Sequence, residues 1–240
     1  MKFINREHLD TFLKNLEVLG SGSQGICYLD KNNKMVYKIF MDYYDKEEAM
    51  YTENDILKFS NVKNNTFIWP NDVIKVDNSI VGYTMPYKRS KSLYQVNPLL
   101  VNLDSLDKAF VNIEEDIKKL TDNGICIYDL RYNTLYNNGK IYAIDTLDYS
   151  YRNVTYNENR EAFDLELMLF LVDTYFDDFV NNDKLLKEMY MGFEVRGVDF
   201  LRVFRNKLST YMGKDIKKLQ SAKSLIKSNN SSSIYKREII

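Results

Sequence analysis

The sequence predicts an α+β protein in which a strand-rich front part precedes a helical back part. Three observations support this prediction. A glycine-rich turn at residues 20–25 is followed by two apolar runs that suit a β-hairpin, and two further apolar runs lie within residues 67–87. From residue 104 onward, apolar residues recur at helical spacing. With 240 residues, the chain is long enough to bury a substantial core, as one domain or as two closely packed lobes.

The front part begins with a short helix and a hairpin. Residues 5–15 suit the helix, and LEVLG suits a strand that leads into the glycine turn. The runs ICYLD and MVYKIF, joined by KNNK, have the pattern of two paired strands. The first 87 residues are therefore expected to be rich in strands.

One helix and two more strands are expected between residues 45 and 87. The stretch DKEEAMYTENDILKF at residues 45–59 is polar at its start, which favours an exposed helix. Its apolar side consists of Met50, Ile56 and Leu57. In residues 67–87, Pro70 and the turn pair Asp77 and Asn78 delimit two apolar runs that suit strands.

The back part is predicted to be mainly helical. Apolar residues at intervals of three and four indicate an amphipathic helix over residues 104–123, with a capping Ser or Asp before it and Gly124 after it. Its apolar positions are Leu106, Phe110, Ile113, Ile117 and Leu120. A hairpin-like pair follows at residues 125–145. The run from residue 163 is apolar on nearly every side through Val172, which indicates a helix surrounded by protein. Further helical patterns lie at residues 183–192 and 197–211.

Residues 213–240 form a basic C-terminal tail. They hold seven Lys or Arg residues and two Asp or Glu residues. Such a run suits a solvated tail, a patch that docks a partner, or a segment that packs on the back part of the chain. The polar run SNNSSS at residues 228–233 is expected to be mobile.

The composition excludes several classes of function. The chain is 45% hydrophobic and 28% charged, with a net charge of −1, so its total charge indicates neither a nucleic acid nor an anionic membrane as partner. No segment has the length of a membrane span, and residues 1–10 lack the apolar stretch of a signal peptide, so we expect a cytoplasmic protein. Cys27, Cys126 and His8 are too few for a zinc site built from Cys and His.

The glycine turn is the first functional motif. A Rossmann turn opens into a helix, but here a hairpin follows Gly25. A Walker A loop ends in Gly-Lys-Ser/Thr, but Ile26 occupies the place of that lysine. What remains is a glycine-rich hairpin over a nucleotide, with Lys38 on the next strand reaching the phosphates.

Phosphoryl transfer also needs a carboxylate to accept the hydroxyl proton and a magnesium ion to hold charge between the phosphates. Asp129, in YDLR, and Asp145, in AID, supply carboxylates in that order after the glycine turn and Lys38. With Glu53, in ENDIL, these motifs follow the order of the protein kinase motifs. Over roughly residues 14–180, the chain resembles a divergent bacterial member of the eukaryotic-type protein kinase superfamily.

The resemblance implies a bilobal protein kinase-like fold. Residues 1–87 would form a small N-terminal lobe with an antiparallel β-sheet and one helix. Residues 88–212 would form a larger, mainly helical C-terminal lobe after the hinge-like TMPYKRSKSL, with residues 213–240 as the tail.

The resemblance also implies an ATP site. The residues that would cover its phosphates are Gly20, Ser21, Gly22, Ser23, Gln24 and Gly25. Lys38 would hold the phosphates and be oriented by Glu53. Met85 would lie at the back of the adenine pocket, with the backbone of Pro86, Tyr87 and Lys88 along the base.

In the second lobe, the resemblance implies the catalytic groups. Asp129 would be the base and Arg131 would neutralise the transferring phosphate, while Asp145 and Asn133 would bind Mg²⁺. Asp164 resembles the residue that anchors the catalytic loop from below, although a carboxylate near a helix N-terminus is also favourable by itself.

Each of these residues has a plain structural interpretation as well. Lys38 suits a solvated strand edge, and TMPY suits the end of a strand. Asp129, Asp145 and Asp148 are of a residue type that favours turns.

The chain departs from the family pattern in four places. Asn133 lies one residue closer to Asp129 than the family's asparagine, and the usual offset falls on Thr134. The family's DFG is here Asp145-Thr146-Leu147. Ile127 and Tyr128 precede Asp129 in place of His and Arg, and no APE motif follows. The absence of a long activation segment weakens the case for a protein substrate.

Three functions fit these residues. The first is a phosphotransferase that uses ATP and Mg²⁺ and acts on Ser, Thr or Tyr of a protein. The second is a small-molecule kinase of the aminoglycoside or choline kinase type. The third is a pseudokinase, a module that binds a nucleotide or a partner protein and transfers nothing. Retention of Lys38, Glu53, Asp129 and Asp145 together argues against the third.

Overall fold

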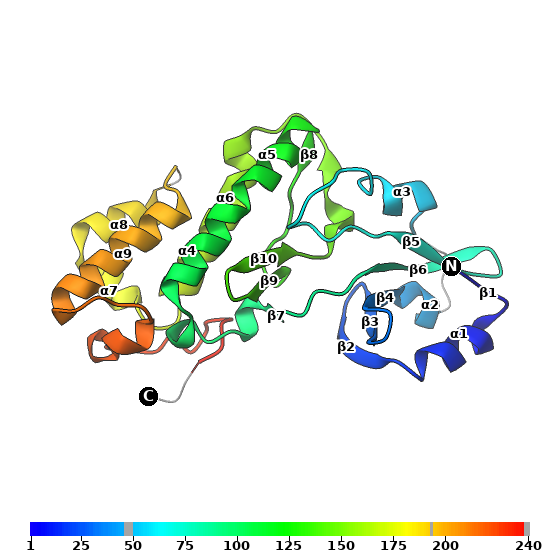
Figure 1. Cartoon of the computed structure of the whole chain (residues 1–240), viewed down its shortest axis with the longest axis horizontal. Coiled ribbons are helices and arrows are strands. Elements are labelled where there is room, and N and C mark those ends of the chain that lie inside the picture. The colour runs from blue at the N-terminus through cyan, green and yellow to red at the C-terminus, as the bar shows by residue number, and fades with distance from the viewer. Residues whose placement is uncertain (46–49, 193, 238–240) are drawn as a thin grey trace. The chain divides into compact units, whose positions relative to one another are not determined.

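The protein has an α+β fold, and its chain divides into two compact units (Figure 1). The computed structural model describes residues 1–45, 50–192 and 194–237. The first unit comprises residues 1–63 and 68–89, and the second comprises residues 64–67 and 90–240.

The first unit is built on a six-stranded sheet with the order β1-β5-β6-β4-β3-β2. Its strands are β1 (Lys2–Phe3), β2 (Glu17–Gly22), β3 (Gly25–Asp30), β4 (Met35–Phe40), β5 (Asp72–Val76) and β6 (Ser79–Pro86). Neighbouring strands are antiparallel except for β1, which pairs with β5 in parallel. The five strands predicted from the apolar runs are confirmed, whereas the short β1 was not predicted.

One face of this sheet packs against the helix α1 (Arg6–Leu13). Leu9 and Leu13 of α1 share a buried cluster with Tyr37 and Ile39 of β4. Because side chains alternate along a strand, Lys38 lies on the opposite face of the sheet. Asn5 caps α1, since its side chain accepts a hydrogen bond from the His8 N–H at 2.9 Å.

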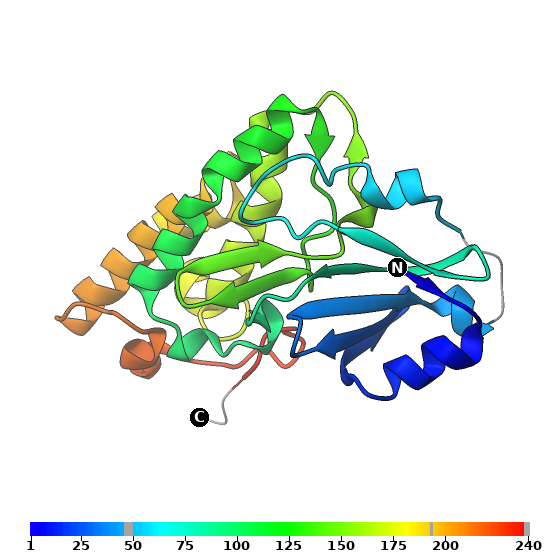
Figure 2. The same ribbon diagram turned by 45° about the vertical axis from the view of Figure 1, so that its right-hand side comes forward.

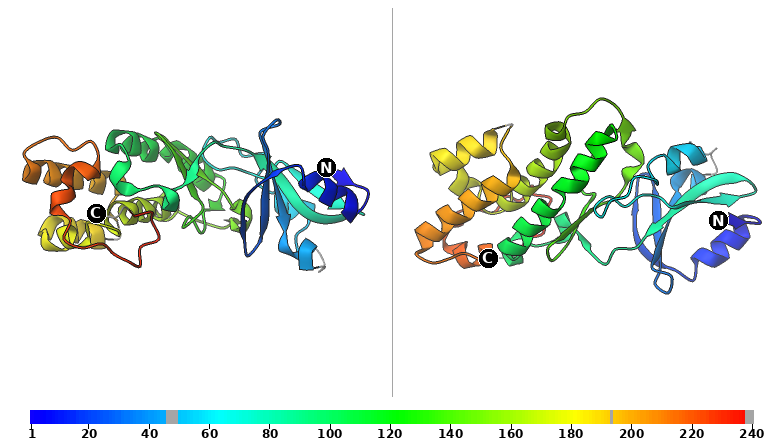
Figure 3. Two further views of the ribbon diagram at one scale, coloured as in Figure 1. Left: turned by 90° about the horizontal axis from the view of Figure 1, so that it is seen from below. Right: turned by 45° about the horizontal axis from the view of Figure 1, so that its top comes forward.

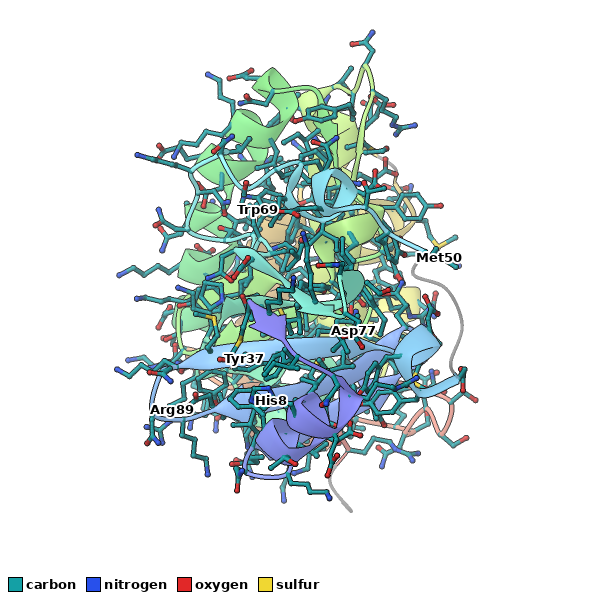
Figure 4. The ribbon with its side chains drawn as sticks, turned by 90° about the vertical axis from the view of Figure 1, so that its right-hand side faces the viewer. His8, Tyr37, Met50, Trp69, Asp77 and Arg89 are labelled. Atoms are coloured by element: carbon teal, nitrogen blue, oxygen red, sulfur yellow. The ribbon has the colours of Figure 1, made fainter. Side chains whose placement is uncertain are left out.

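The turn between β5 and β6 has the predicted chemistry. Asp77 and Asn78 both have positive φ, at 48° and 72°, a conformation that Asp and Asn tolerate better than most residues. Figure 4 shows Asp77 at this turn.

The helix predicted over residues 45–59 is only partly described. Residues 46–49 lie outside the described residues, and the helix α3 spans Glu53–Leu57. It begins after Thr52, which forms a capping box with Asp55. A further short helix, α2 (Met41–Asp45), follows β4 and was not predicted.

The second unit is mainly helical. Its α-helices are α4 (Leu103–Asn112), α5 (Glu114–Asp122), α6 (Tyr156–Val172), α7 (Asp177–Asn182), α8 (Lys184–Met191) and α9 (Gly197–Met212). α6 is buried along most of its second half and ends at Val172, as the apolar pattern predicts. α9 contacts both α6 and α8 (Figure 3).

The single helix predicted over residues 104–123 is in fact two helices that meet at Ile113. The predicted cap is also wrong, because the side chain of Asn102 caps α4. Three acidic residues, Glu114 to Asp116, open α5, where negative charge favours a new helix N-terminus. Gly124, with φ of 66°, follows α5 as expected.

Small strand pairs in the second unit position the loops described below. β9 (Thr134–Asn137) and β10 (Lys140–Ala143) form a hairpin, which α4 contacts (Figure 2). β7 (Lys91–Ser92) pairs with β9. β8 (Ile125–Cys126) pairs with β11 (Ser150–Tyr151).

The tail, residues 213–237, is exposed along most of its length but packs on the protein through a few buried residues. Ile216, Leu219 and Ala222 are fully buried, and the 3₁₀ turns η4 (Leu219–Leu225) begin at Leu219. The basic side chains between them are exposed.

Candidate functional site

The glycine-rich turn of the first unit is the tip of the β2–β3 hairpin. Gly22 pairs with Gly25 across the hairpin, and Ser23 and Gln24 form the connection. Glycine is required at position 25, because a Cβ atom there would lie 2.2 Å from the Ile39 carbonyl oxygen. At Gly20 and Gly22, in contrast, a Cβ atom would meet nothing within 4 Å. The fold itself therefore does not require glycine at these two positions.

Lys38 is a buried lysine that contacts the glycine-rich turn. Its residue is 6% exposed, and its Nζ donates a hydrogen bond to the Gln24 Oε1 at 3.1 Å. The same Nζ lies 5.9 Å from the centroid of the Tyr83 ring on β6. Lysine is almost never fully buried unless it has a partner, so this position is not a solvated strand edge. The structure thus brings Lys38 and the turn together.

The predicted pairing of Glu53 with Lys38 is wrong for the described residues. The Glu53 carboxylate instead lies 2.5 Å from the Nζ of Lys75 on β5. Glu53 is the first residue of α3, and its side chain is half exposed there. The motif ENDIL correctly indicates a helix, but it does not reveal which lysine the helix meets.

The predicted adenine segment continues from β6. Met85 is buried and pairs with Val36, on the same face of the sheet as Lys38. Pro86 is exposed at the end of β6. The Tyr87 N–H donates to the Lys34 carbonyl at 2.9 Å, and Lys88 follows half-buried.

In the second unit, Asp129 and Asn133 lie in one loop between β8 and β9 and contact each other. The Asn133 Nδ2 donates to the Asp129 carbonyl oxygen at 2.9 Å. Asp129 has φ of 43° and Tyr132 has φ of 71°, which is unusual for a bulky side chain. Thr134, the alternative to Asn133, is buried, and its hydroxyl donates to the Leu130 carbonyl at 3.0 Å.

The pKa of Asp129 is raised above its ordinary value. Partial desolvation of this otherwise exposed residue is the main cause, and the negative charges of Asp145 and Asp148 add to it. Asp145 lies two residues after the end of β10 and has a left-handed backbone with φ of 59°. The structure therefore brings the two predicted aspartates into one electrostatic environment.

Asn159 on α6 holds the chain that leads into this loop. Its Oδ1 accepts a hydrogen bond from the Ile127 N–H at 2.8 Å. Its Nδ2 donates to the Ile125 carbonyl at 2.9 Å and to the Thr121 hydroxyl at 3.0 Å. Asn159 is 1% exposed, so these buried groups depend on it.

Asn159 was not predicted, and it has the role that was assigned to Asp164. The Asp164 carboxylate accepts from the Gly197 N–H at 2.7 Å and from the Arg160 Nε at 2.6 Å, so it joins α6 to α9. The available sequence signal was an amide residue in a buried helix, four residues after the capping Thr155. An amide residue at this position does not show which backbone groups it would bind.

Arg131 is exposed in the loop after Asp129 and forms no ion pair within the described part of the chain. Its charge nevertheless acts on Glu166 of α6: burial raises the pKa of Glu166 to about 7, against the opposing effects of Tyr235 and Arg131. Arg131 therefore lies in the loop two residues after Asp129 and is an electrostatic neighbour of the buried Glu166.

A comparison with models of known protein families gave no match, and a comparison with curated protein sequences gave none. Over residues 1–45, 50–192 and 194–237, no group of three or more His, Cys, Asp or Glu side chains is placed to hold a metal ion. None of the helices that the structure describes is long and apolar enough to span a membrane.

Proposed function

We propose that this protein is a phosphotransferase of the protein kinase type that uses ATP and Mg²⁺, with a bilobal kinase-like fold. Residues of the first unit bind the nucleotide, and residues of the second unit transfer the γ-phosphoryl group. The observation that supports this proposal best is the buried Lys38 ammonium in contact with the glycine-rich turn. A buried cation beside a glycine turn suits the binding of phosphates.

The open glycines of the turn support the same proposal. The fold itself does not require glycine at positions 20 and 22. The close approach of a ligand to the backbone is a physical reason for glycine at both positions. Side chains at these positions would cover the backbone N–H groups that phosphate oxygens use.

The second unit offers oxygen ligands for Mg²⁺. We assign these to the Asp145 carboxylate and the Asn133 Oδ1, because the Asn133 amide nitrogen is already used on the Asp129 carbonyl. Mg²⁺ is commonly bound through one or two protein oxygens, with phosphates and water completing its shell, so a larger cluster of acidic residues is not needed. When bound, the ion would neutralise charge on the phosphates.

Asp129 is the proposed general base. Its carboxylate accepts the proton of the acceptor hydroxyl as the hydroxyl oxygen forms a bond to the γ-phosphorus and the bond to the β–γ bridging oxygen breaks. Arg131 places a positive charge beside the transferring group, and ADP is released.

The acceptor is a protein hydroxyl in the first version of this proposal. A small-molecule hydroxyl is the second version, and the chain after Asp145 favours it. Only the 3₁₀ turn η3 (Thr146–Asp148), the short β11 and a few residues separate Asp145 from α6. A segment this short offers little platform for a peptide.

Incubation with γ-labelled ATP and Mg²⁺ tests the proposal, with mass spectrometry for phosphorylated residues on the protein. The Asp129→Asn variant should lose roughly two to four orders of magnitude in turnover, the range for a lost general base, while binding ATP as the wild type does. Asp122→Asn is the matched control, because Asp122 is an exposed aspartate at the end of α5.

Two results would overturn the proposed enzyme. One is transfer that is unchanged in Asp129→Asn. The other is a wild-type protein that binds ATP but transfers phosphate neither to itself, nor to added hydroxyl compounds, nor to water, as a nucleotide-binding pseudokinase would.

A further inference from the structure

We propose that residues 228–237 form a strap that holds the loop of Asp129 and Arg131 in place, with Tyr235 as its positioning residue. The effect of the strap on turnover rests on the proposed function. Its effect on the order of the loop does not. All contacts involved lie within the second unit.

The strap is attached to the segment after α6 and to α7 by backbone and side-chain hydrogen bonds. The Asn230 backbone N–H donates to the Thr174 carbonyl at 2.9 Å, and the hydroxyls of Thr174 and Ser233 lie 2.7 Å apart. Ser228 donates to the Asp178 carboxylate at 2.8 Å. The serines and asparagines that suggested a mobile segment are therefore used as hydrogen-bonding groups.

Tyr235 connects the strap to the middle of α6. It is 2% exposed, and its ring meets the Phe170 ring edge-on at 5.4 Å. Its hydroxyl donates to the Glu166 carbonyl at 3.4 Å. The positive charge of Arg131 lowers the pKa of both Glu166 and Tyr235, although burial raises both overall. Arg131, Glu166 and Tyr235 are thus electrostatic neighbours.

The strap reaches the same loop by a second route. The Lys236 N–H donates to the Tyr94 carbonyl at 2.8 Å, and the Tyr94 ring meets the Tyr132 ring edge-on at 5.5 Å. Two residues before Tyr94, the Ser92 hydroxyl donates to the Tyr132 carbonyl at 3.0 Å. Tyr132 has the positive φ noted above, between Arg131 and Asn133.

A bulky residue with positive φ persists only where its surroundings hold it. The Tyr235 ring packs the strap against α6, and the strap reaches the loop through Tyr94 and Tyr132. Loss of the strap should therefore release the loop toward ordinary backbone angles and displace Asp129 and Arg131. A displacement of about 1 Å in a reacting group is enough to slow an enzyme about a hundredfold.

Amide hydrogen exchange on the full chain tests the strap without requiring activity. In Tyr235→Ala, peptides covering residues 127–134 should exchange at least tenfold faster than in the wild type, while peptides covering α9 keep their rates. Tyr235→Phe retains the ring contact and should stay close to the wild type. Tyr235→Leu, which keeps apolar volume but not the ring, should behave as Tyr235→Ala and serves if the alanine variant does not fold.

Leu219→Ala is the matched control, because Leu219 is fully buried in the same tail but lies outside the strap. It should lower the melting temperature without a specific change at residues 127–134. If the loop exchanges equally in the wild type and in a folded Tyr235→Leu or Tyr235→Ala, the strap proposal is wrong. It is equally wrong if Leu219→Ala loosens the loop as much.

Turnover separates the strap from the proposed function. With an active enzyme, Tyr235→Ala should lower kcat at least tenfold with little change in KM for ATP, and Tyr235→Phe should restore kcat. A faster-exchanging loop in a chain that never transfers phosphate would support the strap and contradict the proposed enzyme. A loss of kcat that only tracks the fraction of unfolded protein would contradict the strap.

Discussion

Glu166 is a buried carboxyl whose protonation is linked to the stability of the protein. Burial raises its pKa from the ordinary 4.5 to about 7, with Tyr235 and Arg131 opposing the shift. Between these two pH values the folded state keeps a proton that the unfolded state has released. The free energy of unfolding therefore falls as the pH rises through this window.

Glu166→Gln removes this titration while keeping the shape of the side chain. We expect the variant and the wild type to have similar stability near pH 4, where Glu166 is neutral in both states. Near pH 8 the free energy of unfolding of the variant should exceed that of the wild type by at most about 3 kcal/mol. Urea unfolding at a series of pH values measures the difference. A difference that stays constant with pH would show that Glu166 does not titrate with a raised pKa.

The role of Lys38 could be predicted from the sequence only in part. Its place after a glycine turn, on the second strand of a hairpin, predicted a phosphate-binding role. Its burial and its contact with Gln24 follow from the register of β3, β4 and β6, which no local pattern contains. The same limit explains the wrong partner for Glu53.

At the scale of elements, the apolar periodicity predicted most strands and helices, because alternation and helical spacing are local properties. It missed the break at Ile113, where apolar spacing continues through a change of helix. It also missed β1, whose two residues are too few to show a period. It also did not show where the mostly exposed tail packs, because charge and polarity outweighed three buried residues at regular spacing.

Asn159 provides a prediction at this scale, because it joins α6, α5 and the chain before Asp129. Asn159→Ala should destabilise the protein by about 2–4 kcal/mol, since it leaves the buried Ile127 N–H and Ile125 carbonyl without this partner. Asn182→Ala is the control: the exposed Asn182 also donates to a carbonyl, that of Asp178, and its loss should cost under about 0.5 kcal/mol. Urea denaturation measures the loss of unfolding free energy in both variants. Equal losses would show that Asn159 does not anchor the chain before Asp129.

At the scale of the molecule, the order of the motifs predicted an α+β chain with strands first and helices second. The candidate site was predictable only as a set of residue types in order. The groups that contact those residues come from distant positions: Lys75 for Glu53, and Asn159 for the chain before Asp129. Such pairs depend on tertiary proximity, which a single sequence does not display.

In the proposed function, nucleotide binding belongs to the first unit and phosphoryl transfer to the second. Measurements of nucleotide affinity can test this assignment. Lys38 belongs to the first unit and Asp129 to the second. Because Lys38 is proposed to contact phosphates, Lys38→Met should weaken ATP and ADP binding by roughly 10- to 100-fold, the value of a hydrogen bond between charged groups, and leave adenosine binding unchanged. Asp129→Asn should leave all three affinities near those of the wild type. Isothermal titration measures them.

The Glu53→Gln variant tests whether the ion pair between Glu53 and Lys75 affects nucleotide binding by the first unit. This half-exposed ion pair contributes little to stability, about 0–1 kcal/mol, so both this variant and Lys75→Ala should bind ATP within about twofold of the wild type. If Glu53→Gln weakens ATP binding as much as Lys38→Met while Lys75→Ala does not, Glu53 acts on Lys38 when nucleotide is bound, and the family's pairing would apply after all. If Lys38→Met binds ATP as tightly as the wild type, the glycine-rich hairpin and its buried lysine are a structural feature of the sheet, and the nucleotide site lies elsewhere.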